Sequence, residues 1–300
     1  MGITLGIVGY GEVGGIFGRG LRAREGIDAI RVWDLKFADP TYGAAARAAA
    51  EADGMQVAGG MRDLCTHADL VISAVTASST LAVAQEAARH ARAGMKFLDL
   101  NSASPGTKQQ AAAALEAAGA AYVEAGVMTS VPPHGIRVPM LLGGPHAEAL
   151  AEQLRDWGME ARAVSERLGV ASAIKMSRSI MIKGLEALVI ESYATARRYG
   201  VEAHLLPTLQ ETFPQIDWER QGAYFFSRVV RHGQRRAEEM RESALTVREA
   251  GFEPIMAAAI ADKQEGVARL AQAGLFEGLD ERAKWQDYAD RLIGHAADQA

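Results

Sequence analysis

The sequence predicts an α/β domain with a doubly wound, mostly parallel sheet, followed by an all-helical domain. Three observations support this fold class. A glycine-rich turn follows the first apolar strand, at residues 9–14. Strand and helix patterns then alternate to about residue 165, as in parallel sheets covered by helices. After Gly169 only helical periodicity remains. We therefore expect one domain over residues 1–165 and a second over residues 166–300.

The turn after the first strand carries a dinucleotide-binding fingerprint. The apolar residues 3–8 are followed by Gly9-Tyr10-Gly11-Glu12-Val13-Gly14 and a helical pattern to about residue 25. The three glycines permit a tight turn, the approach of a pyrophosphate to the backbone, and close packing of helix on strand. The N-terminus of the helix then offers free N–H groups to the diphosphate. The first domain is thus predicted to be a Rossmann domain that binds its cofactor through residues 9–14.

The second strand, at residues 29–33, ends at Asp34, twenty residues after Gly14. A carboxylate at this position accepts hydrogen bonds from the hydroxyls of the adenosine ribose and repels a 2′-phosphate. Asp34 therefore favours NAD over NADP as the cofactor. Lys36 would attract a 2′-phosphate, and we interpret it as a solvated loop residue.

Six further strands and three helices complete the predicted first domain. The strands are expected over residues 55–57, 69–75, 96–100, 121–127, 139–144 and 160–164, and the helices over residues 44–52, 105–118 and up to about 157.

Ligands of open parallel sheets bind beyond the carboxyl ends of the strands. The loop after the fourth strand, with Val75 and Thr76, should therefore approach the nicotinamide end of the cofactor. The loop after the fifth strand offers Asn101, Ser102 and Ser104, whose small polar side chains suit a ligand. The alternative use of Asn and Ser here is to cap the helix that starts at residue 105.

Composition narrows the function classes. The 300 residues are 49% hydrophobic and 23% charged, as in ordinary soluble proteins, and no apolar stretch approaches the length of a membrane span. The net charge of −5 and the absence of a basic run argue against nucleic acid or anionic membranes as partners. The single cysteine, Cys65, cannot form an internal disulfide, and we expect no metal because metal-binding motifs are absent. With no signal peptide recognised, a cytoplasmic location is expected.

The first helix of the second domain has two contrasting faces. Lys175, Ser179 and Glu186 line one face, about a third of a turn from an apolar stripe that we predict to be core. The apolar stripe consists of Ile174, Met181, Leu185, Leu188 and Ser192.

Later helices of the second domain are expected over residues 203–212, 224–250 and 255–273.

Lys175 is the candidate acid/base. It lies in the first turns of that helix, where the second domain must face the cofactor. A lysine shielded from water beside an oxidised nicotinamide has its charged form disfavoured, which lowers its pKa toward a range useful for catalysis. The hypothesis is that Lys175 exchanges a proton with the group whose carbon exchanges hydride.

These motifs resemble the β-hydroxyacid dehydrogenase superfamily, which includes 6-phosphogluconate dehydrogenase and 3-hydroxyisobutyrate dehydrogenase. The resemblance is most specific at residues 9–14, 99–105 and 169–179. It implies that Lys175 is the general acid/base, that Ser102 touches the nicotinamide side of the cofactor, and that the helical halves pack together in a homodimer or larger oligomer.

The chain departs from the family pattern in three places. Ser179 stands where the family has Asn, and its hydroxyl can still form a hydrogen bond with a substrate. On a late helix, Glu238-Glu239 stands where the family has Lys-Asp. Met128-Thr129 begins the segment that replaces Ser-Gly-Gly, so we take both residues as candidates for substrate contact. Residues 127–133, 183–186 and 232–236 resemble a less characterised branch whose helical half is a domain of unknown function (DUF1932-like).

A small anionic substrate would need local positive charge. His232, Arg235 and Arg236 form the densest such group in the second domain, and Arg178, shortly after Lys175, is a second candidate. The alternative is that the two adjacent arginines pair with acidic neighbours along a solvated helix face, namely Glu238, Glu239 and Glu242.

The sequence therefore predicts an NAD-dependent dehydrogenase acting on the CH–OH group of a small hydroxy acid or polyol acid. Lys175 would accept the hydroxyl proton while Ser102, Ser179 and Asn101 orient the substrate. An imine reductase or reductive aminase on the same fold and a non-catalytic NAD-binding sensor are the alternatives. Coupling of oxidation to decarboxylation or isomerisation is a third, although Ile182 occupies the position of the usual companion carboxylate.

Overall fold

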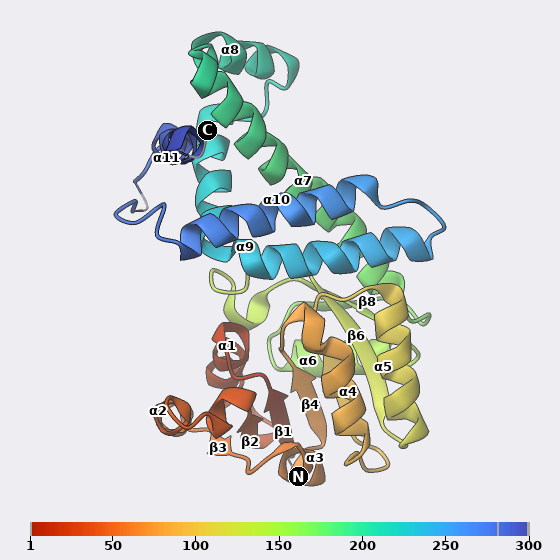
Figure 1. Ribbon diagram of the computed structural model, residues 1–300. Coiled ribbons are helices and arrows are strands. Elements are labelled where there is room, and N and C mark those ends of the chain that lie inside the picture. Colours follow the sequence, from red (N-terminus) through yellow and green to blue (C-terminus); the bar gives the residue numbers. More distant parts are fainter. Residues whose placement is uncertain (1, 281, 299–300) are drawn as a thin grey trace. The chain divides into compact units, whose positions relative to one another are not determined.

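The structure of the protein is a computed structural model, which describes residues 2–280 and 282–298. The chain divides into two compact units, Met1–Ser177 and Arg178–Ala300 (Figure 1). The division falls inside helix α7 (Val170–Tyr199), at residue 177 against the boundary of 165 expected from the sequence. The first turns of α7 therefore belong to the first unit.

The first unit is built on an eight-stranded sheet in the order β3-β2-β1-β4-β5-β6-β7-β8. Neighbouring strands are parallel except for the antiparallel pair β6 and β7. This confirms the predicted doubly wound sheet, and each predicted strand is present. The strands are β1 (Ile3–Val8), β2 (Ile27–Trp33), β3 (Gln56–Val57), β4 (Leu70–Ser73), β5 (Lys96–Asp99), β6 (Ala121–Val127), β7 (Met140–Gly143) and β8 (Ala161–Ser165).

Helices cover both faces of the sheet. One apolar core lies under α1, α2 and α6, and a second lies under α3, α4 and α5, which Figure 1 shows in front of the sheet. The helices are α1 (Glu12–Leu21), α2 (Gly43–Ala52), α3 (Met61–His67), α4 (Thr80–Ala88), α5 (Pro105–Ala117) and α6 (Ala147–Asp156), with short 3₁₀ turns at η1 (Leu35–Ala38), η2 (Ala77–Ser79) and η3 (Gly135–Arg137).

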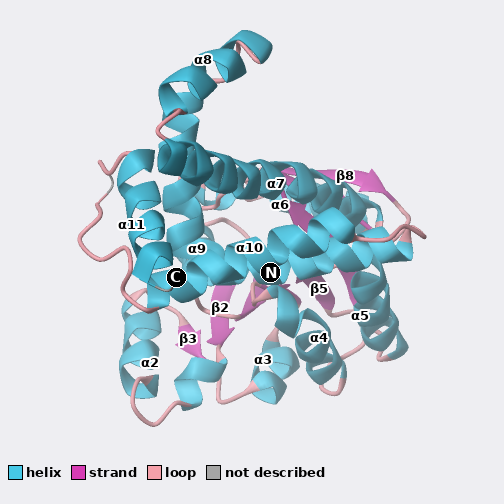
Figure 2. Cartoon of the chain, turned by 45° about the horizontal axis from the view of Figure 1, so that its top comes forward, coloured by secondary structure: helices cyan, strands magenta, loops and turns pink. Residues whose placement is uncertain are grey.

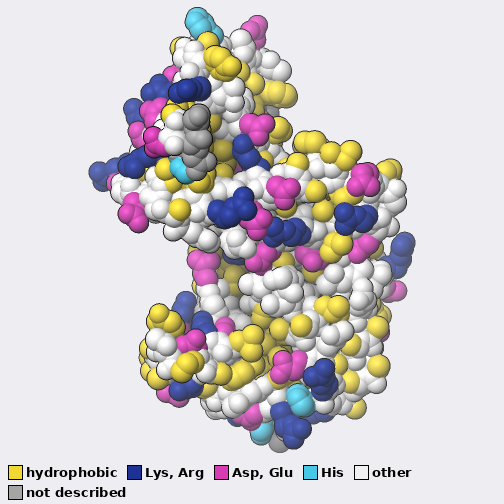
Figure 3. All heavy atoms as spheres, viewed as in Figure 1, with side chains coloured by type: hydrophobic (Ala, Val, Ile, Leu, Met, Phe, Trp, Pro, Cys, Tyr) yellow, Lys and Arg dark blue, Asp and Glu magenta, His cyan; other side chains and the backbone are white. Residues whose placement is uncertain are grey.

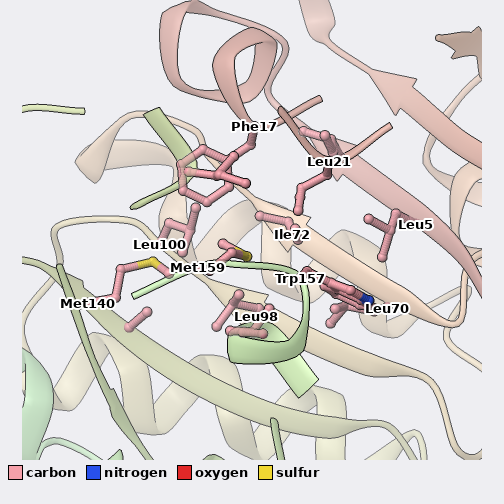
Figure 4. Packing of buried hydrophobic residues seen from close by; sticks show 14 of the residues in the cluster. Leu5, Phe17, Leu21, Leu70, Ile72, Leu98, Leu100, Met140, Trp157 and Met159 are labelled. Carbon is pink, nitrogen blue, oxygen red and sulfur yellow. The ribbon is translucent and has the colours of Figure 1, made fainter. Parts of the chain in front are cut away.

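The core under α1 fixes the helix that follows the fingerprint. Phe17 and Leu21 of α1 are fully buried and lie over Ile72 and Leu98 of the central strands (Figure 4). Burial of each such side chain contributes about 1.5–3 kcal/mol. The glycine-rich turn is therefore held against the sheet by the helix that it starts.

Among residues 178–280 and 282–298, the second unit consists of helices joined by loops and contains no strand (Figure 2). Its aromatic core includes Tyr193 of α7, Phe226 of α9 and Trp285 of α11, and the rings of Tyr193 and Trp285 are 4.9 Å apart. The helix α9 begins six residues earlier than predicted, because Asp217 caps it by accepting from the Arg220 N–H. Beyond α7 the helices are α8 (Glu202–Thr212), α9 (Trp218–Glu249), α10 (Ile255–Gln272) and α11 (Trp285–Asp298).

The prediction that the apolar stripe of α7 is core is wrong. Met181 is 66% exposed and Leu188 is 56% exposed, and Ile174 and Ser192 also lie at the surface. The face packed against α9 and α10 instead carries polar side chains, because ion pairs and hydrogen bonds from those helices satisfy them. Helical spacing indicated two faces correctly but not which of them is buried.

No helix within the described residues is long and apolar enough to cross a bilayer. Charged side chains of both signs are interspersed over the face shown in Figure 3. This distribution agrees with the net charge of −5 and with the absence of a basic run from the sequence.

Candidate cofactor and acid–base site

The fingerprint turn is shaped by its glycines. Gly9 has a positive φ of 88°, and a Cβ there would lie 2.5 Å from the Ala74 carbonyl oxygen. A Cβ at Gly14 would lie 2.0 Å from the Gly9 carbonyl oxygen. By contrast, a Cβ at Gly11 would meet nothing within 4 Å, and Gly11 starts α1 without a side-chain cap. The open N-terminus of α1 fits the diphosphate of a dinucleotide.

Asp34 lies directly beside this turn. Its Oδ2 accepts from the Tyr10 N–H at 2.7 Å and its Oδ1 accepts from the Lys36 N–H at 2.9 Å. The Lys36 ammonium group donates to the Tyr10 carbonyl and lies 3.8 Å from Asp34 Oδ2. Lys36 is exposed, as expected for a solvated residue, but its ammonium group also binds the protein. Lys36 fastens η1 to the fingerprint turn.

The side chain of Tyr10 points into the core. Its hydroxyl donates to Asp53 Oδ2 at 2.9 Å, and burial together with this bond raises the pKa of Tyr10 above its usual range. Only the backbone of Tyr10 is thus left for a cofactor. Glu12 is exposed and Val13 half-buried in the first turn of α1, so their backbone N–H groups belong to the open helix end.

The strands β1, β2, β4, β5 and β6 end at one edge of the sheet, which we call the carboxyl edge. There, Asn101 Oδ1 accepts from the Val75 N–H at 2.7 Å, and Asn101 Nδ2 donates to Ser73 Oγ at 2.9 Å. Asn101 is buried, and its amide ties the loops after β4 and β5 together. This use of the amide gives no support to the expected substrate contact. Thr76 is exposed and Ser102 half-buried at the same edge.

Ser104 acts as a helix cap. It is fully buried, and its Oγ accepts from the Thr107 N–H at the start of α5. The capping alternative drawn from the sequence is confirmed, and the structure gives no support to a substrate contact by Ser104.

A buried ionic cluster lies beneath these loops and was not anticipated from the sequence. Lys108 Nζ is 2.9 Å from Asp99 Oδ1, and the Tyr122 hydroxyl donates to Asp99 Oδ2 at 2.7 Å. Asp99 Oδ1 also accepts from the Asn101 N–H. Burial, and secondarily the Asp99 charge, raise the pKa of Tyr122 well above its usual range. The cluster fixes the end of β5. In the sequence, the charged Asp99 within an apolar strand was the signal from which this cluster could have been predicted.

A second buried carboxylate, Glu124 of β6, holds the start of α7. Its Oε1 accepts from the Gly169 N–H at 2.7 Å and the Ala171 N–H at 3.1 Å, and its Oε2 accepts from the Ser172 hydroxyl. A negative charge at a helix N-terminus is favourable for the helix dipole. Glu124 thus fixes the position from which α7 starts.

Lys175 lies half-buried in the second turn of α7, over the end of β6. A Cβ at Gly126 would lie 3.4 Å from Lys175 Cβ and 3.1 Å from the Ala171 carbonyl oxygen. The missing side chain at Gly126 therefore lets this turn approach the strand. Lys175 stands at the carboxyl edge, as do the loop residues Met128, half-buried, and Thr129, exposed.

The other predicted site residues, namely Arg178, Ser179, His232 and Arg235, belong to the second unit. Ser179 is buried. Arg178 is exposed and His232 half-buried. Arg235 Nε lies 4.0 Å from Glu239, so the alternative of pairing along α9 holds for Arg235. The same alternative, pairing with acidic neighbours along α9, is wrong for Arg236. This residue is buried and forms a bidentate ion pair with Glu186 of α7.

Across residues 2–280 and 282–298, no group of three or more His, Cys, Asp or Glu side chains is placed to hold a metal ion.

In comparisons with known proteins, each half of the chain matches a described family. Residues 4–151 match the family described as the NAD binding domain of 6-phosphogluconate dehydrogenase. Residues 196–267 match a domain of unknown function, DUF1932. The expected pairing of these two domains is thereby confirmed.

Two similar solved structures extend along nearly the whole chain. A conserved hypothetical protein from Sinorhizobium meliloti is 37% identical, covers 97% of this chain and 96% of its own, and has a TM-score of 0.76. A conserved protein of unknown function, described as structurally similar to 3-hydroxyacid dehydrogenases, is 30% identical over 90% of this chain and 99% of its own, with a TM-score of 0.69.

More distant structures share the fold alone. They include 3-hydroxyisobutyrate dehydrogenase from Mycobacterium tuberculosis, 15% identical over 97% and 99% of the two chains with a TM-score of 0.68. An imine reductase from Myxococcus stipitatus with NADP+ is 19% identical over 90% and 95%, with a TM-score of 0.54.

Fold and site together define an NAD(P)-binding oxidoreductase with a helical second domain. The chain belongs to the β-hydroxyacid dehydrogenase superfamily, in the branch that carries the DUF1932 domain.

Proposed function

We propose that the protein is an NAD-dependent dehydrogenase that oxidises the CH–OH group of a small hydroxy acid or polyol acid. The observation that carries this proposal is the placement of Lys175 over Gly126 at the carboxyl edge of the sheet. The fingerprint turn and the loops after β4 and β5 end at that same edge. A lysine so placed is suited to act as an acid or base toward a substrate beside the cofactor.

The cofactor, when bound, supplies a nicotinamide ring that accepts the hydride. The residues of the first unit supply the remaining functions. The Lys175 amine accepts the hydroxyl proton, and Glu124 fixes the helix that carries Lys175. Ser102, half-buried at the carboxyl edge, is placed to orient a ligand there.

Asp34 supports NAD as the cofactor. Its carboxylate is held at the fingerprint turn by the N–H groups of Tyr10 and Lys36. A carboxylate at the end of β2 binds ribose hydroxyls and repels a 2′-phosphate. The Lys36 ammonium group beside Asp34 acts in the opposite sense, and we expect it to weaken the preference without reversing it.

A homodimer is the assembly that the second unit supports. Met181 and Leu188 of α7 and Ile255 and Met256 of α10 are large apolar side chains exposed at the surface. Apolar surface of this kind on a long helix is typical of an interface between copies of a chain. Light scattering on Met181→Glu/Leu188→Glu should show a smaller species than the unaltered protein, and an unchanged mass would contradict this assembly.

The test of the proposed activity is a scan of 2- and 3-hydroxy acids and aldonic acids at alkaline pH, following the reduction of NAD and of NADP. Lys175→Ala should lower turnover by ~10²-fold or more, the scale of general acid–base catalysis. Arg198→Ala, which removes an exposed cation near the far end of α7, is the matched control for loss of a positive charge. Equal turnover by Lys175→Ala and the unaltered protein would refute the mechanism.

Two other outcomes would indicate a different function for the protein. Reduction of cyclic imines with NADPH, without oxidation of any acid, would indicate an imine reductase. Retention of NAD without turnover of either class, and without an effect of Lys175→Ala, would indicate a sensor.

A further inference from the structure

A buried ion pair closes the base of the loop that joins β5 to α5. Asp99 is the last residue of β5, Lys108 lies in the first turn of α5, and both side chains are fully buried. Lys108 Nζ lies 2.9 Å from Asp99 Oδ1 and donates to the Asp99 carbonyl oxygen at 3.1 Å. We call this ion pair the loop clasp, because it joins the two ends of the segment 99–108.

The loop clasp also holds the turn that carries Ser102. Asp99 Oδ1, which Lys108 contacts, accepts from the Asn101 N–H at 2.9 Å. Asn101 and Ala103 are buried, whereas Ser102 between them is half-buried. The clasp therefore fixes the backbone on the inner side of a turn that presents Ser102 at the carboxyl edge.

The same hydrogen-bond network reaches the loop after β4. The Asn101 amide accepts from the Val75 N–H at 2.7 Å and donates to Ser73 Oγ at 2.9 Å. The Leu100 N–H donates to the Ser73 carbonyl oxygen at 3.0 Å. Any displacement of Asn101 would therefore move both loops, the one after β4 and the one after β5.

These two loops lie on the side of the sheet that the nicotinamide half of a dinucleotide must use. The strand order β3-β2-β1-β4-β5 places Asp34, which follows β2, on one side of β1 and the two loops on the other side. A carboxylate at the position of Asp34 marks the adenosine end, and the diphosphate binds at the start of α1. The half that carries the nicotinamide then extends over β4 and β5.

Stability does not require the loop clasp to be charged. Burial removes both ions from water at a cost, and well-packed apolar residues in place of a buried ion pair are often equally stable or more stable. Apolar side chains would, however, offer no acceptor to the Asn101 N–H and no directional bond between the ends of the loop. The consequence that needs the ion pair is thus the shape of the loop.

We propose that Asp99 and Lys108 are positioning residues that hold the loops after β4 and β5 in the shape that binds the nicotinamide half of the cofactor. Neither residue touches the cofactor, and both act through Asn101 and the backbone beside Ser102. This inference rests on the proposed function, of which it uses the cofactor and not the substrate.

The test compares NADH and ADP-ribose, each titrated calorimetrically into the protein. Both ligands carry the adenosine and the diphosphate, but only NADH carries the nicotinamide. The variant Lys108→Met/Asp99→Asn opens the loop clasp without leaving a buried charge. We expect it to weaken NADH binding about fivefold or more, the scale of one lost hydrogen bond to the ligand, and to leave ADP-ribose binding unchanged. The ratio of the dissociation constant of ADP-ribose to that of NADH should therefore fall.

Tyr122→Phe is the matched control. It removes a buried hydrogen bond to Oδ2 of the same Asp99 carboxylate but leaves the contacts of Oδ1 with Lys108 and the Asn101 N–H. This variant should unfold at a lower temperature and keep the affinity ratio of the unaltered protein. Ser73→Ala, which removes the acceptor of the Asn101 amide, should lower the ratio by a smaller factor than the double variant.

An unchanged affinity ratio in the double variant would overturn the inference, and so would an equal fall of the ratio in Tyr122→Phe. An unaltered protein that binds NADH no more tightly than ADP-ribose would overturn it as well. If the double variant does not fold, Ser73→Ala decides the outcome, and an unchanged ratio there refutes the inference. Failure of the proposed function would appear separately, in the hydroxy acid scan and in Lys175→Ala, because these binding measurements involve no turnover.

Discussion

Replacement of Glu124 by leucine tests how the start of α7 is held. The carboxylate accepts from the N–H groups of Gly169 and Ala171 and from the Ser172 hydroxyl. In Glu124→Leu the Ser172 hydroxyl keeps its second acceptor, the Gly169 carbonyl oxygen at 3.3 Å, whereas the two N–H groups lose theirs. At about 1–3 kcal/mol for each buried donor left without a partner, the expected loss is about 2–6 kcal/mol.

Urea unfolding followed by circular dichroism measures this loss. Glu124→Gln is the matched control, because its amide oxygen still accepts from the backbone and its shape is almost unchanged. We expect Glu124→Gln to retain most of the stability that Glu124→Leu loses. If the two variants unfold at the same urea concentration, or if Glu124→Leu costs less than about 1 kcal/mol, the assignment of Glu124 as the anchor of α7 is refuted.

Three further changes test other parts of the first unit. Lys108→Met leaves the buried Asp99 carboxylate without its cation, and thermal unfolding should show a loss of about 3–5 kcal/mol that Lys108→Met/Asp99→Asn partly recovers. Asp34→Ser removes the charge that repels a 2′-phosphate and leaves Lys36 in place, so the ratio of kcat/KM for NAD to that for NADP should fall on the order of tenfold, or about 1.4 kcal/mol. Burial raises the pKa of the Cys65 thiol to about 12. The native state therefore keeps its proton while the unfolded thiol loses it above about pH 8.5, so Cys65 contributes a fall in the free energy of unfolding of about 1.4 kcal/mol per pH unit up to about pH 12, and the free energy of unfolding of Cys65→Ala should fall less steeply over this range.

The first unit was predictable because its signals are local. The fingerprint glycines, the apolar strands and Asp34 each lie in a short run of sequence, and every predicted strand is found in the sheet. The short helices α3 and α4 were missed because seven and nine residues give too little periodicity.

The second unit was harder because its signals are long-range. The buried partners of Glu186 and Lys183 lie on α9 and α10, at least 50 residues away in sequence. Periodicity along α7 alone assigned the apolar stripe to the core, whereas pairing with Arg236 and Glu239 brings the polar face inward. Glu124 and Lys108 were missed for the same reason, since their roles depend on partners from other elements.

The three glycines of the fingerprint respond to different selective pressures. A side chain at Gly9 or Gly14 would collide with the backbone of the protein itself, so folding preserves both residues whether or not a cofactor binds. Gly11 faces open space, and folding places no such demand on it. In descendants of this chain that no longer bind the cofactor, Gly11 would be the first of the three glycines to be replaced. The residue at this position is therefore the better indicator of whether a member of this branch still binds a dinucleotide.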